Sequence, residues 1–441
     1  MGEERLLGAH ECRLIGDTKE VSQFLVAPNG PLQGSLAIAG AKNSVLKIMA
    51  AAILAEGTTI LRNVPEIRDV EIMAEMLTAL GLSVRRLDGG LLEIVTPRTQ
   101  QIVPEAPYEL VEKMRASIVV LGPLLARCGR AKVSLPGGDN FGSRPIDFHL
   151  NALEEMGTTF TVAHGIIHGK VASGRLRGAA MVLPFPSHTT TDNLLMAAVL
   201  AEGTTIIDNA AQEPEVVDLA AFLSAMGARI EGAGTGRITV TGVSSLGAVT
   251  HDIIPDRVVA ATFFVATAIA GGKVEVVGAK AEHMESLLRK LEHMGVSLQP
   301  SSNGVQVEAP GRLKATDLAT LPYPGVATDY TPFLVAALAT AEGVSFVTEN
   351  LFAGRFRYVD ELLRMGADIR TDGHHLVIRG VEQLSGARVK SHDIRAGAAV
   401  MLAGLSADGE TTIDDAGHLD RGYENLPLQL NSLGASVVRL S

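Results

Sequence analysis

The chain has 441 residues, of which 46% are hydrophobic and 4% aromatic, and it contains no tryptophan. Its 38 basic and 49 acidic residues give a net charge of −11, which argues against a general nucleic-acid-binding protein, because such proteins need a broad basic surface. The two cysteines cannot build a disulfide framework, and no apolar run is long enough to span a bilayer. We therefore expect a soluble, cytoplasmic protein with aliphatic cores. No spacing of histidine, cysteine or carboxylate residues suggests a metal site, and the expected assembly is a monomer or a weak homo-oligomer.

A short motif that is typical of a helix end followed by a strand recurs six times, and its glycines are 76, 70, 68, 71 and 68 residues apart. A second glycine motif precedes each copy by 23 to 28 residues. The two motifs predict six units of about 70 residues. The glycines are Gly81, Gly157, Gly227, Gly295, Gly366 and Gly434 in the first motif, and Gly57, Gly129, Gly203, Gly272, Gly343 and Gly409 in the second.

Each unit has the pattern of a helix, a strand, a second helix and further strands. In the first unit, Ser44 is a candidate N-cap for an apolar helix that ends near Ala55, and a second helix is expected over residues 67–80. The first helix of most units is apolar all round and must be buried on every side. We predict an α/β fold of two lobes, each of three units, with helices inside and sheets outside.

The lobes are not expected to be consecutive halves of the chain. A strand-like segment over residues 23–38 precedes the first helix, and the last unit ends after Val438 without a strand partner of its own. Connections near residues 41 and 252 would join the lobes around a cleft that holds the active site. The expected divisions are an N-terminal extension (1–19), a C-terminal-type lobe (20–41 with 253–441) and a second lobe (42–252).

The segment LPGGDNFGSRP at 135–145 combines three glycines with an acid and an arginine. Asp139 and Arg144 would place a proton donor and an anion clamp on a pliable loop, as an active-site lid requires. A surface turn with a charged tip is the alternative for these eleven residues alone.

Taken together, these features resemble the enolpyruvyl transferases, whose two lobes are each an inside-out α/β barrel of three repeats. The resemblance covers nearly everything from about Phe24 onward, and the combination of motifs is specific although each one alone is weak. The matching stretches are GAKNSVLK (40–47), MRASIVVLGPL (114–124), LPGGDNFGSRPIDFH (135–149), LAEGTTIIDNAAQEPEVVDL (200–219), IPDR (254–257), TDY (328–330), ENLFAGRF (349–356), DIRAGAAVMLAG (393–404) and HLDRGYE (418–424).

The resemblance implies transfer of the enolpyruvyl group of phosphoenolpyruvate to a sugar hydroxyl, with release of phosphate by addition and elimination. The motifs favour the 3-hydroxyl of UDP-N-acetylglucosamine, the acceptor in the first committed step of peptidoglycan synthesis, and no cofactor is implied. Two alternatives stay open. One is another acceptor, such as shikimate 3-phosphate or a different uridine nucleotide, and the other is a non-catalytic relative that binds a UDP-sugar.

By resemblance, Lys42, Arg144 and Arg421 hold the phosphate of phosphoenolpyruvate, and Lys42 and Arg421 belong to the catalytic set. Arg395 supports the carboxylate region of that substrate, and Arg115 provides a further anion contact. A surface ion pair is the alternative for each arginine alone. The substrate contacts that the resemblance adds are Asn43, Ser187 and Phe352.

Two aspartates are implied to move protons. Asp329 matches the family residue beside the reacting hydroxyl and would act as the general base, whereas its residue context alone also fits an N-cap of the helix expected over 330–339. Asp139 stands where most members carry the cysteine that the epoxide fosfomycin alkylates. We expect Asp139 to protonate C3 and the enzyme to resist fosfomycin, because a carboxylate is a poorer nucleophile than a thiolate.

The segment FPSHTTTDN at 185–193 departs from the family pattern in the loop that borders the uridine. His188 and Thr189 are bulkier and more polar than the small residues usual there. Two interpretations of His188 stay open: a contact with a base or a phosphate of the acceptor, and a loop histidine that faces water.

Overall fold

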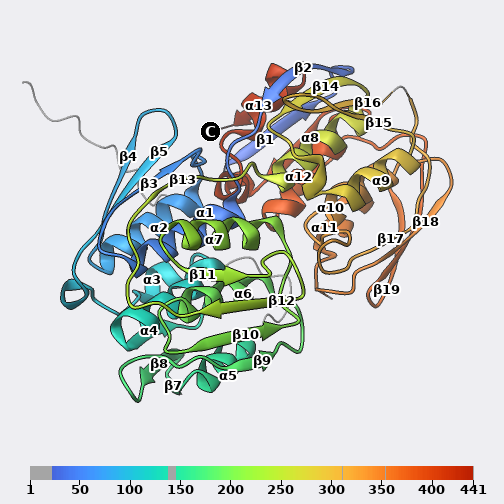
Figure 1. Ribbon diagram of the computed structural model, residues 1–441. Helices are drawn as coiled ribbons and strands as arrows, with labels where there is room; N and C mark the ends of the chain where they lie inside the picture. Colours follow the sequence, from blue (N-terminus) through green and yellow to red (C-terminus); the bar gives the residue numbers. More distant parts are fainter. Residues whose placement is uncertain (1–21, 138–145, 310, 353, 441) are drawn as a thin grey trace, which may run out of the picture.

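The structure is a computed structural model that describes residues 22–137, 146–309, 311–352 and 354–440. Two hydrophobic cores divide it into two lobes. The first core gathers buried residues from Val45 to Ile253, and the second gathers Phe24 to Ile38 together with Val258 to Val437. In Figure 1 the first lobe is coloured blue to green and the second mainly yellow to red.

The first lobe contains three separate sheets within the described residues. In spatial order, their strands are β13 (Thr250–Asp252), β3 (Gly57–Arg62), β5 (Leu91–Thr96) and β4 (Ser83–Leu87); β6 (Arg130–Ser134), β8 (Ile166–Val171) and β7 (Thr158–Ala163); and β11 (Arg229–Glu231), β12 (Arg237–Thr241), β10 (Thr204–Asp208) and β9 (Ala180–Val182).

Three further sheets in the described chain make up the second lobe, so that each predicted unit corresponds to one sheet. Their strands are β15 (Ser297–Pro300), β16 (Gly304–Ala309), β14 (Gly272–Val277) and β2 (Leu32–Ala37); β17 (Leu318–Ala319), β18 (Val344–Thr348), β20 (His375–Arg379) and β19 (Asp368–Asp372); and β21 (Arg388–Lys390), β22 (Thr411–Asp414), β1 (Gln23–Ala27) and β23 (Ser436–Leu440).

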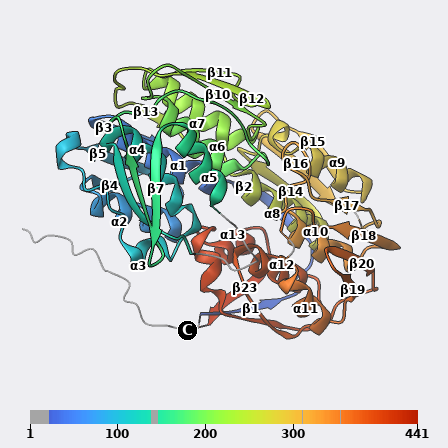
Figure 2. The same ribbon diagram turned by 90° about the horizontal axis from the view of Figure 1, so that it is seen from below.

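Strands β1 and β2 come from the start of the chain but lie in the second lobe, as the blue arrows in Figures 1 and 2 show. β1 pairs antiparallel with both β22 and β23, and β2 pairs parallel with β14. The last strand of the chain therefore finds its partner near the beginning of the sequence, and β1 completes the sheet of the last unit.

Helices α10 (Thr331–Leu338) and α12 (Ile394–Gly404) are buried at every residue, whereas strand residues alternate between buried and exposed positions. The predicted arrangement of helices inside and sheets outside is thus confirmed, with no closed β-barrel in the part of the chain that is described. The other helices are α1 (Lys42–Ala51), η1 (Ala52–Leu54), α2 (Arg68–Ala79), η2 (Thr99–Gln101), α3 (Tyr108–Val111), η3 (Arg115–Val120), α4 (Leu121–Cys128), α5 (Asp147–Glu155), α6 (His188–Ala198), α7 (Pro214–Ala225), α8 (Arg257–Ala270), η4 (Ala281–His283), α9 (Glu285–His293), α11 (Arg357–Arg364), η5 (Ala416–Arg421) and α13 (Leu426–Ser432).

The predicted N-cap of the first helix is wrong. α1 begins at Lys42 after Ala41, which makes no side-chain capping bond. Ser44 lies inside the helix, and its hydroxyl donates to a carboxylate oxygen of Asp218 on α7 instead. A tertiary partner in the same lobe therefore takes the hydroxyl that local reasoning assigned to the helix start.

The two connections between the lobes lie side by side. Gly40 forms an antiparallel bridge with Pro255, and the backbone amide of Ala41 donates to the backbone oxygen of Ile254 at 2.7 Å. A Cβ atom at Gly40 would lie 2.0 Å from the backbone oxygen of Asn63, so this close approach requires glycine. The bridge fixes α1 and α8 at the same point between the lobes.

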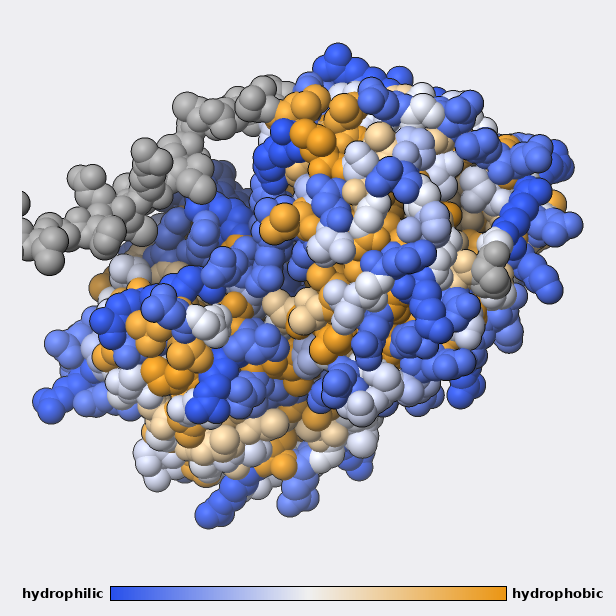
Figure 3. All heavy atoms as spheres, turned by 90° about the horizontal axis from the view of Figure 1, so that it is seen from above, coloured by the Kyte–Doolittle hydropathy of each residue, from blue (hydrophilic) through white to orange (hydrophobic). Residues whose placement is uncertain are grey.

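The surface seen from above is covered largely by hydrophilic side chains, with apolar residues scattered among them (Figure 3). Among the helices of the described residues, none combines the length and the apolar character needed to cross a membrane.

Candidate active site

A cavity of about 590 Å³ lies between the two lobes. This volume falls in the range of small-molecule sites, and such sites favour the boundary between lobes. The structure brings every described residue of the predicted site to this one cavity, while Asp139 and Arg144 lie outside the described residues. The site residues that line it are Lys42, Asn43, Arg115 and Ser187 from the first lobe, and Asp329, Phe352, Arg395 and Arg421 from the second.

Asp69, in the first turn of α2, links two of the predicted cations from opposite lobes. Lys42 Nζ lies 2.7 Å from Asp69 Oδ2, and Arg421 Nε donates to Asp69 Oδ1 at 3.0 Å. Burial alone would raise the pKa of Asp69, but the two cations outweigh it and hold that pKa below the usual value. The carboxylate is therefore ionised, and the cluster already pairs Lys42 and Arg421 with an anion.

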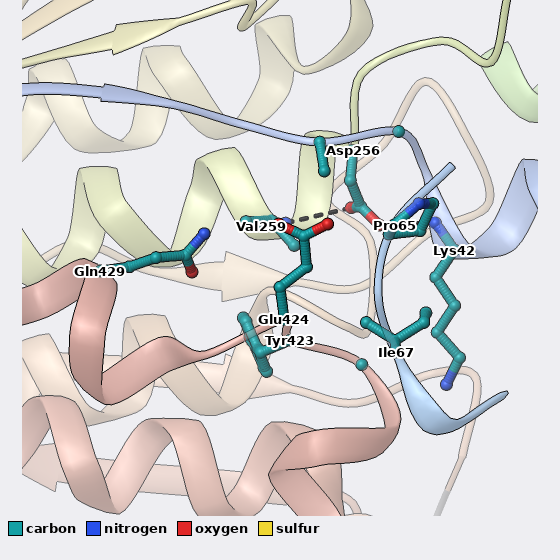
Figure 4. Close-up of a pocket in the computed structure, with 11 residues that line it drawn as sticks. Lys42, Pro65, Ile67, Asp256, Val259, Tyr423, Glu424 and Gln429 are labelled. Atoms are coloured by element: carbon teal, nitrogen blue, oxygen red, sulfur yellow. Dashed lines mark hydrogen bonds between the residues drawn. The ribbon is translucent and has the colours of Figure 1, made fainter. Parts of the chain in front are cut away.

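A smaller pocket lies beside this cluster, between Lys42 and Ile67 on one side and Val259 and Tyr423 on the other (Figure 4). Asp256 is the N-cap of α8 and accepts hydrogen bonds from the first backbone amides of that helix. It also accepts from the backbone amide of Lys42 at 2.9 Å. In Figure 4 the ammonium end of Lys42 points away from Asp256. Asp256 therefore fixes the start of α1 through the backbone amide of Lys42 and leaves the Lys42 ammonium group for other contacts.

Asp329 lies between two arginines of the second lobe. Arg355 Nη2 donates to its Oδ1 at 2.7 Å, and Arg395 Nε donates to its Oδ2 at 3.4 Å. Burial alone would raise the pKa of Asp329, but Arg355 and Arg395 outweigh it and hold that pKa well below the usual range. The capping alternative is wrong, because α10 begins at Thr331 with Tyr330 at its N-cap position and no side-chain cap.

His188 begins α6, with Ser187 as the N-cap, rather than lying in a water-facing loop. Its Nε2 lies 3.4 Å from Lys47 Nζ and 3.4 Å from Asp192 Oδ2. Burial is the main cause that lowers the pKa of His188 well below 6.5, and the positive charge of Lys47 adds to it. The histidine is therefore a neutral imidazole in the wall of the cavity.

Arg115, at the start of η3, connects the cavity wall to the glycine-rich segment. Its Nη1 donates to the backbone oxygen of Pro136 at 3.3 Å. Pro136 belongs to the segment 135–145, of which residues 138–145 lie outside the described part of the chain. The described start of the predicted lid thus meets the cavity at Arg115.

Sequence reasoning missed several charged residues of the site, among them Asp69, Arg355 and Lys47. Arg355 is the one basic residue of the motif ENLFAGRF, and this could have marked it as a partner for an acid of the site. Lys47 could have been found as a cation within the apolar run from Val45 to Ala51 of α1, because a cation in such a run needs a buried partner. Asp69 carried no local signal beyond an acid in the first turn of a helix.

A profile of the family described as EPSP synthase (3-phosphoshikimate 1-carboxyvinyltransferase) matches residues 26–430 of the chain. The chain belongs to this family. Among curated members, the UDP-N-acetylglucosamine 1-carboxyvinyltransferase of Corynebacterium jeikeium is 51% identical over 417 residues, which cover 95% of this chain and 99% of the relative. The enzyme of the same name from Nocardia farcinica is 49% identical, over 95% of this chain and 98% of the relative.

Solved structures share the fold of this enolpyruvyl transferase. The enolpyruvyl transferase NikO from Streptomyces tendae superposes with a TM-score of 0.85 at 24% identity, over 95% of this chain and 99% of the other. EPSP synthase from Acinetobacter baumannii gives a TM-score of 0.74 at 21% identity, over 95% and 100% of the two chains. These likenesses confirm the fold that the six repeats predicted.

Proposed function

We propose that this chain transfers the enolpyruvyl group of phosphoenolpyruvate to the 3-hydroxyl of UDP-N-acetylglucosamine and releases phosphate. Relatives named for that activity align with nearly the whole chain at 51% and 49% identity. The structural observation that carries the proposal is the meeting of Lys42 and Arg421 at Asp69, in the cavity that also holds Asp329. Anion clamps beside an ionised carboxylate are what addition of a hydroxyl to an anionic enol phosphate needs.

We assign Lys42 and Arg421, together with Arg144, to the phosphate of phosphoenolpyruvate. A bound phosphate would give these cations a second anion beside Asp69, so their charges would stay paired throughout binding. Arg395 is assigned to the carboxylate region of the same substrate. The remaining assignments are Arg115 to a further anion contact, and Asn43, Ser187 and Phe352 to the acceptor.

The proton transfers are assigned to the two aspartates. Asp139 protonates C3 as the acceptor oxygen bonds to C2, and Asp329 orients the acceptor hydroxyl and receives its proton. In the elimination, C3 returns its proton to Asp139, the bond between C2 and the phosphate oxygen breaks, and phosphate leaves with the proton taken from the hydroxyl. Arg355 and Arg395 stabilise the anionic form of Asp329, so this residue starts each cycle ready to accept.

We also propose where in the cell the protein acts and where its two lobes begin and end. Enolpyruvyl transfer to UDP-N-acetylglucosamine commits the sugar nucleotide to peptidoglycan synthesis, and both substrates are small soluble anions, which favours the cytoplasm. We also propose that residues 20–41 with 253–441 form one lobe and residues 42–252 the other, a division that the two hydrophobic cores support.

Phosphate release tests the proposal. The enzyme is given phosphoenolpyruvate with UDP-N-acetylglucosamine, with shikimate 3-phosphate, with another uridine nucleotide, or with no acceptor. We expect phosphate, with one enolpyruvyl product per phosphate, only in the first reaction. Phosphate with shikimate 3-phosphate alone would move the activity to that acceptor, and tight binding of UDP-N-acetylglucosamine without turnover would identify a non-catalytic relative.

A further inference from the structure

Glu349, which follows β18, is a buried acid that the reaction above does not use. Its side chain is 2% exposed and accepts four hydrogen bonds. The hydroxyls of Thr320 and Thr328 donate to it at 2.8 Å each. The backbone amides of Leu351 and Phe352 donate to its Oε1 at 2.9 and 3.1 Å. Glu349 thereby holds the turn that contributes Leu351 and Phe352 to the cavity wall.

A series of hydrogen bonds connects Glu349 to Asp329 through Thr328 and Arg355. The Thr328 hydroxyl has one proton and donates it to Glu349 Oε2, so its oxygen accepts the bond from Arg355 Nη1 at 3.1 Å. Arg355 Nη2 then donates to Asp329 Oδ1 at 2.7 Å. Because a carboxylate only accepts and a guanidinium only donates, each hydrogen bond in this series has a fixed donor and a fixed acceptor.

We propose that Glu349 is a positioning residue for enolpyruvyl transfer. Through Thr328 it fixes the guanidinium of Arg355, and Arg355 in turn aims the carboxylate of Asp329 at the acceptor hydroxyl. The inference rests on the proposed function, because it needs Asp329 to be the group beside that hydroxyl. Glu349 touches no substrate in this scheme and acts only through its neighbours.

Because each of these hydrogen bonds has a fixed donor and acceptor, Glu349→Gln disrupts the series with almost no change in side-chain size. Two backbone amides donate to Oε1, so the glutamine oxygen must stay on that side and its NH₂ group must face Thr328. The NH₂ group and the guanidinium of Arg355 then both donate to the Thr328 oxygen, and the threonine proton loses its acceptor. An unsatisfied buried donor is costly, so the contact between Thr328 and Arg355 should loosen.

The experiment compares Glu349→Gln, Thr328→Val and the double variant, with Glu361→Gln as the matched control. Glu361 is 5% exposed in the same lobe, but its carboxylate accepts from His392 and from the backbone amide of Lys390. Steady-state kinetics with phosphoenolpyruvate and UDP-N-acetylglucosamine, pH profiles and thermal unfolding are measured for each. Both glutamine variants are expected to unfold at a lower temperature than the unmodified enzyme.

Of the two glutamine variants, only Glu349→Gln should also lower kcat, by about 10- to 100-fold, while the KM for phosphoenolpyruvate changes less than about threefold. As Arg355 loosens, the pKa of Asp329 rises, so the acid limb of kcat should move to higher pH in this variant and not in Glu361→Gln. In the Thr328→Val variant, adding Glu349→Gln should lower kcat by less than about threefold further. The valine has already removed the hydrogen bonds that connect Glu349 to Arg355.

Three results would overturn the inference: an unchanged kcat in Glu349→Gln, an equal loss of kcat in Glu361→Gln, or a full loss that persists on the Thr328→Val background. The unmodified enzyme is assayed in the same series. If it releases no phosphate with UDP-N-acetylglucosamine, the proposed function fails and this inference fails with it. If it turns over normally and Glu349→Gln does too, the inference alone fails.

Discussion

Arg421 of the second lobe and Asp69 of the first are joined across the cavity, with Arg421 Nε 3.0 Å from Asp69 Oδ1. Lys42 Nζ lies 2.7 Å from the other oxygen of the same carboxylate. The Asp69 side chain is 1% exposed, whereas those of Lys42 and Arg421 are 11% and 16% exposed. One buried anion therefore pairs with two cations that we assign to the substrate phosphate, and it also links the two lobes.

Asp69→Asn should destabilise the free protein and increase the rise in its melting temperature when phosphate is added. The two cations lose their counter-charge at a cost of about 1–3 kcal/mol, less than for a fully buried pair because both remain partly hydrated. Inorganic phosphate or phosphoenolpyruvate should then raise the melting temperature more in the variant than in the unmodified protein, because the bound anion supplies the missing charge. Thermal unfolding with and without each ligand measures both effects.

The control for this prediction is Asp208→Asn. Asp208 also pairs with an arginine, Arg237, at 2.5 Å, but on the surface, where the two side chains are 30% and 68% exposed. Its loss should change the melting temperature little and leave the phosphate response unaltered. An equal phosphate response in both variants would show that the cluster at Asp69 does not bind the anion.

Asp192→Asn should change the way that stability depends on pH. Neither oxygen of this buried carboxylate has a hydrogen-bond partner in the described structure, and burial is the largest cause that raises its pKa from 3.8 to about 7. Between these values the native state binds the proton more tightly than the unfolded state, so this group's contribution to stability falls as pH rises and is constant above about 7. The free energy of unfolding of the variant, relative to the unmodified protein, should therefore rise through that window by at most about 1.4 kcal/mol per pH unit.

Urea unfolding of both proteins at pH 5, 6, 7 and 8 measures this difference. Asp252→Asn is the control, because Asp252 is 70% exposed in a surface pair with Arg62 and should give a difference that stays flat with pH. A flat difference for Asp192→Asn as well would mean that the acid keeps an ordinary pKa, held ionised by Lys47 at 3.5 Å.

The repeat architecture could be predicted because its markers are local. Gly81, after α2, has a φ of 98°, and Gly157, after α5, has a φ of 96°, and both lie in the left-handed region that favours glycine. A helix that ends in this way leaves a glycine in the sequence whatever it packs against. The six units could therefore be counted, and their apolar helices assigned to the inside, before any contact was known.

The contacts of the site could not be predicted, because they depend on which units meet. Asp69 and Arg421 are 352 positions apart, and no local pattern relates them. The residue context of Asp329 also fitted an N-cap, but in the structure two arginines from other parts of the lobe donate to its carboxylate. Family resemblance supplied the predicted site residues, whereas the acid that pairs with Lys42 and Arg421 emerged only from the packing of the lobes.

Asp329→Asn should lower kcat by about 100-fold or more and leave the KM for phosphoenolpyruvate within a few-fold, because the carboxylate acts on the acceptor hydroxyl. Since the pKa of Asp329 is held well below its usual range, the residue is ionised throughout neutral pH. The loss should therefore be of similar size at every pH from 5 to 9. Steady-state kinetics across that range measure it, with the exposed Asp368→Asn, in a surface pair with Arg379, as the control. A kcat in the Asp329 variant as high as in the Asp368→Asn control would contradict the assignment.

Asp139→Cys should keep measurable activity and become sensitive to fosfomycin. Asp139 lies outside the described residues, so the prediction rests on the chemistry of the side chain. A thiolate opens the epoxide by forming a carbon–sulfur bond, and the released alkoxide takes up a proton, whereas a carboxylate attacks far more slowly. Phosphate release after incubation with the drug, together with a mass gain of one drug molecule per chain, measures the effect.

The unmodified protein supplies the first control, because it should stay active, and any label on its two cysteines sets the baseline for the mass gain. Its Cys128 does not substitute for the missing thiolate, since burial raises the pKa of that thiol and keeps it protonated. Asp139→Asn is the second control and should lose most activity without gaining sensitivity, because an amide neither donates the C3 proton nor attacks the epoxide. An active Asp139→Cys variant that resists the drug would show that position 139 does not face the reacting carbon, and the C3 acid would then have to be sought elsewhere in the cavity.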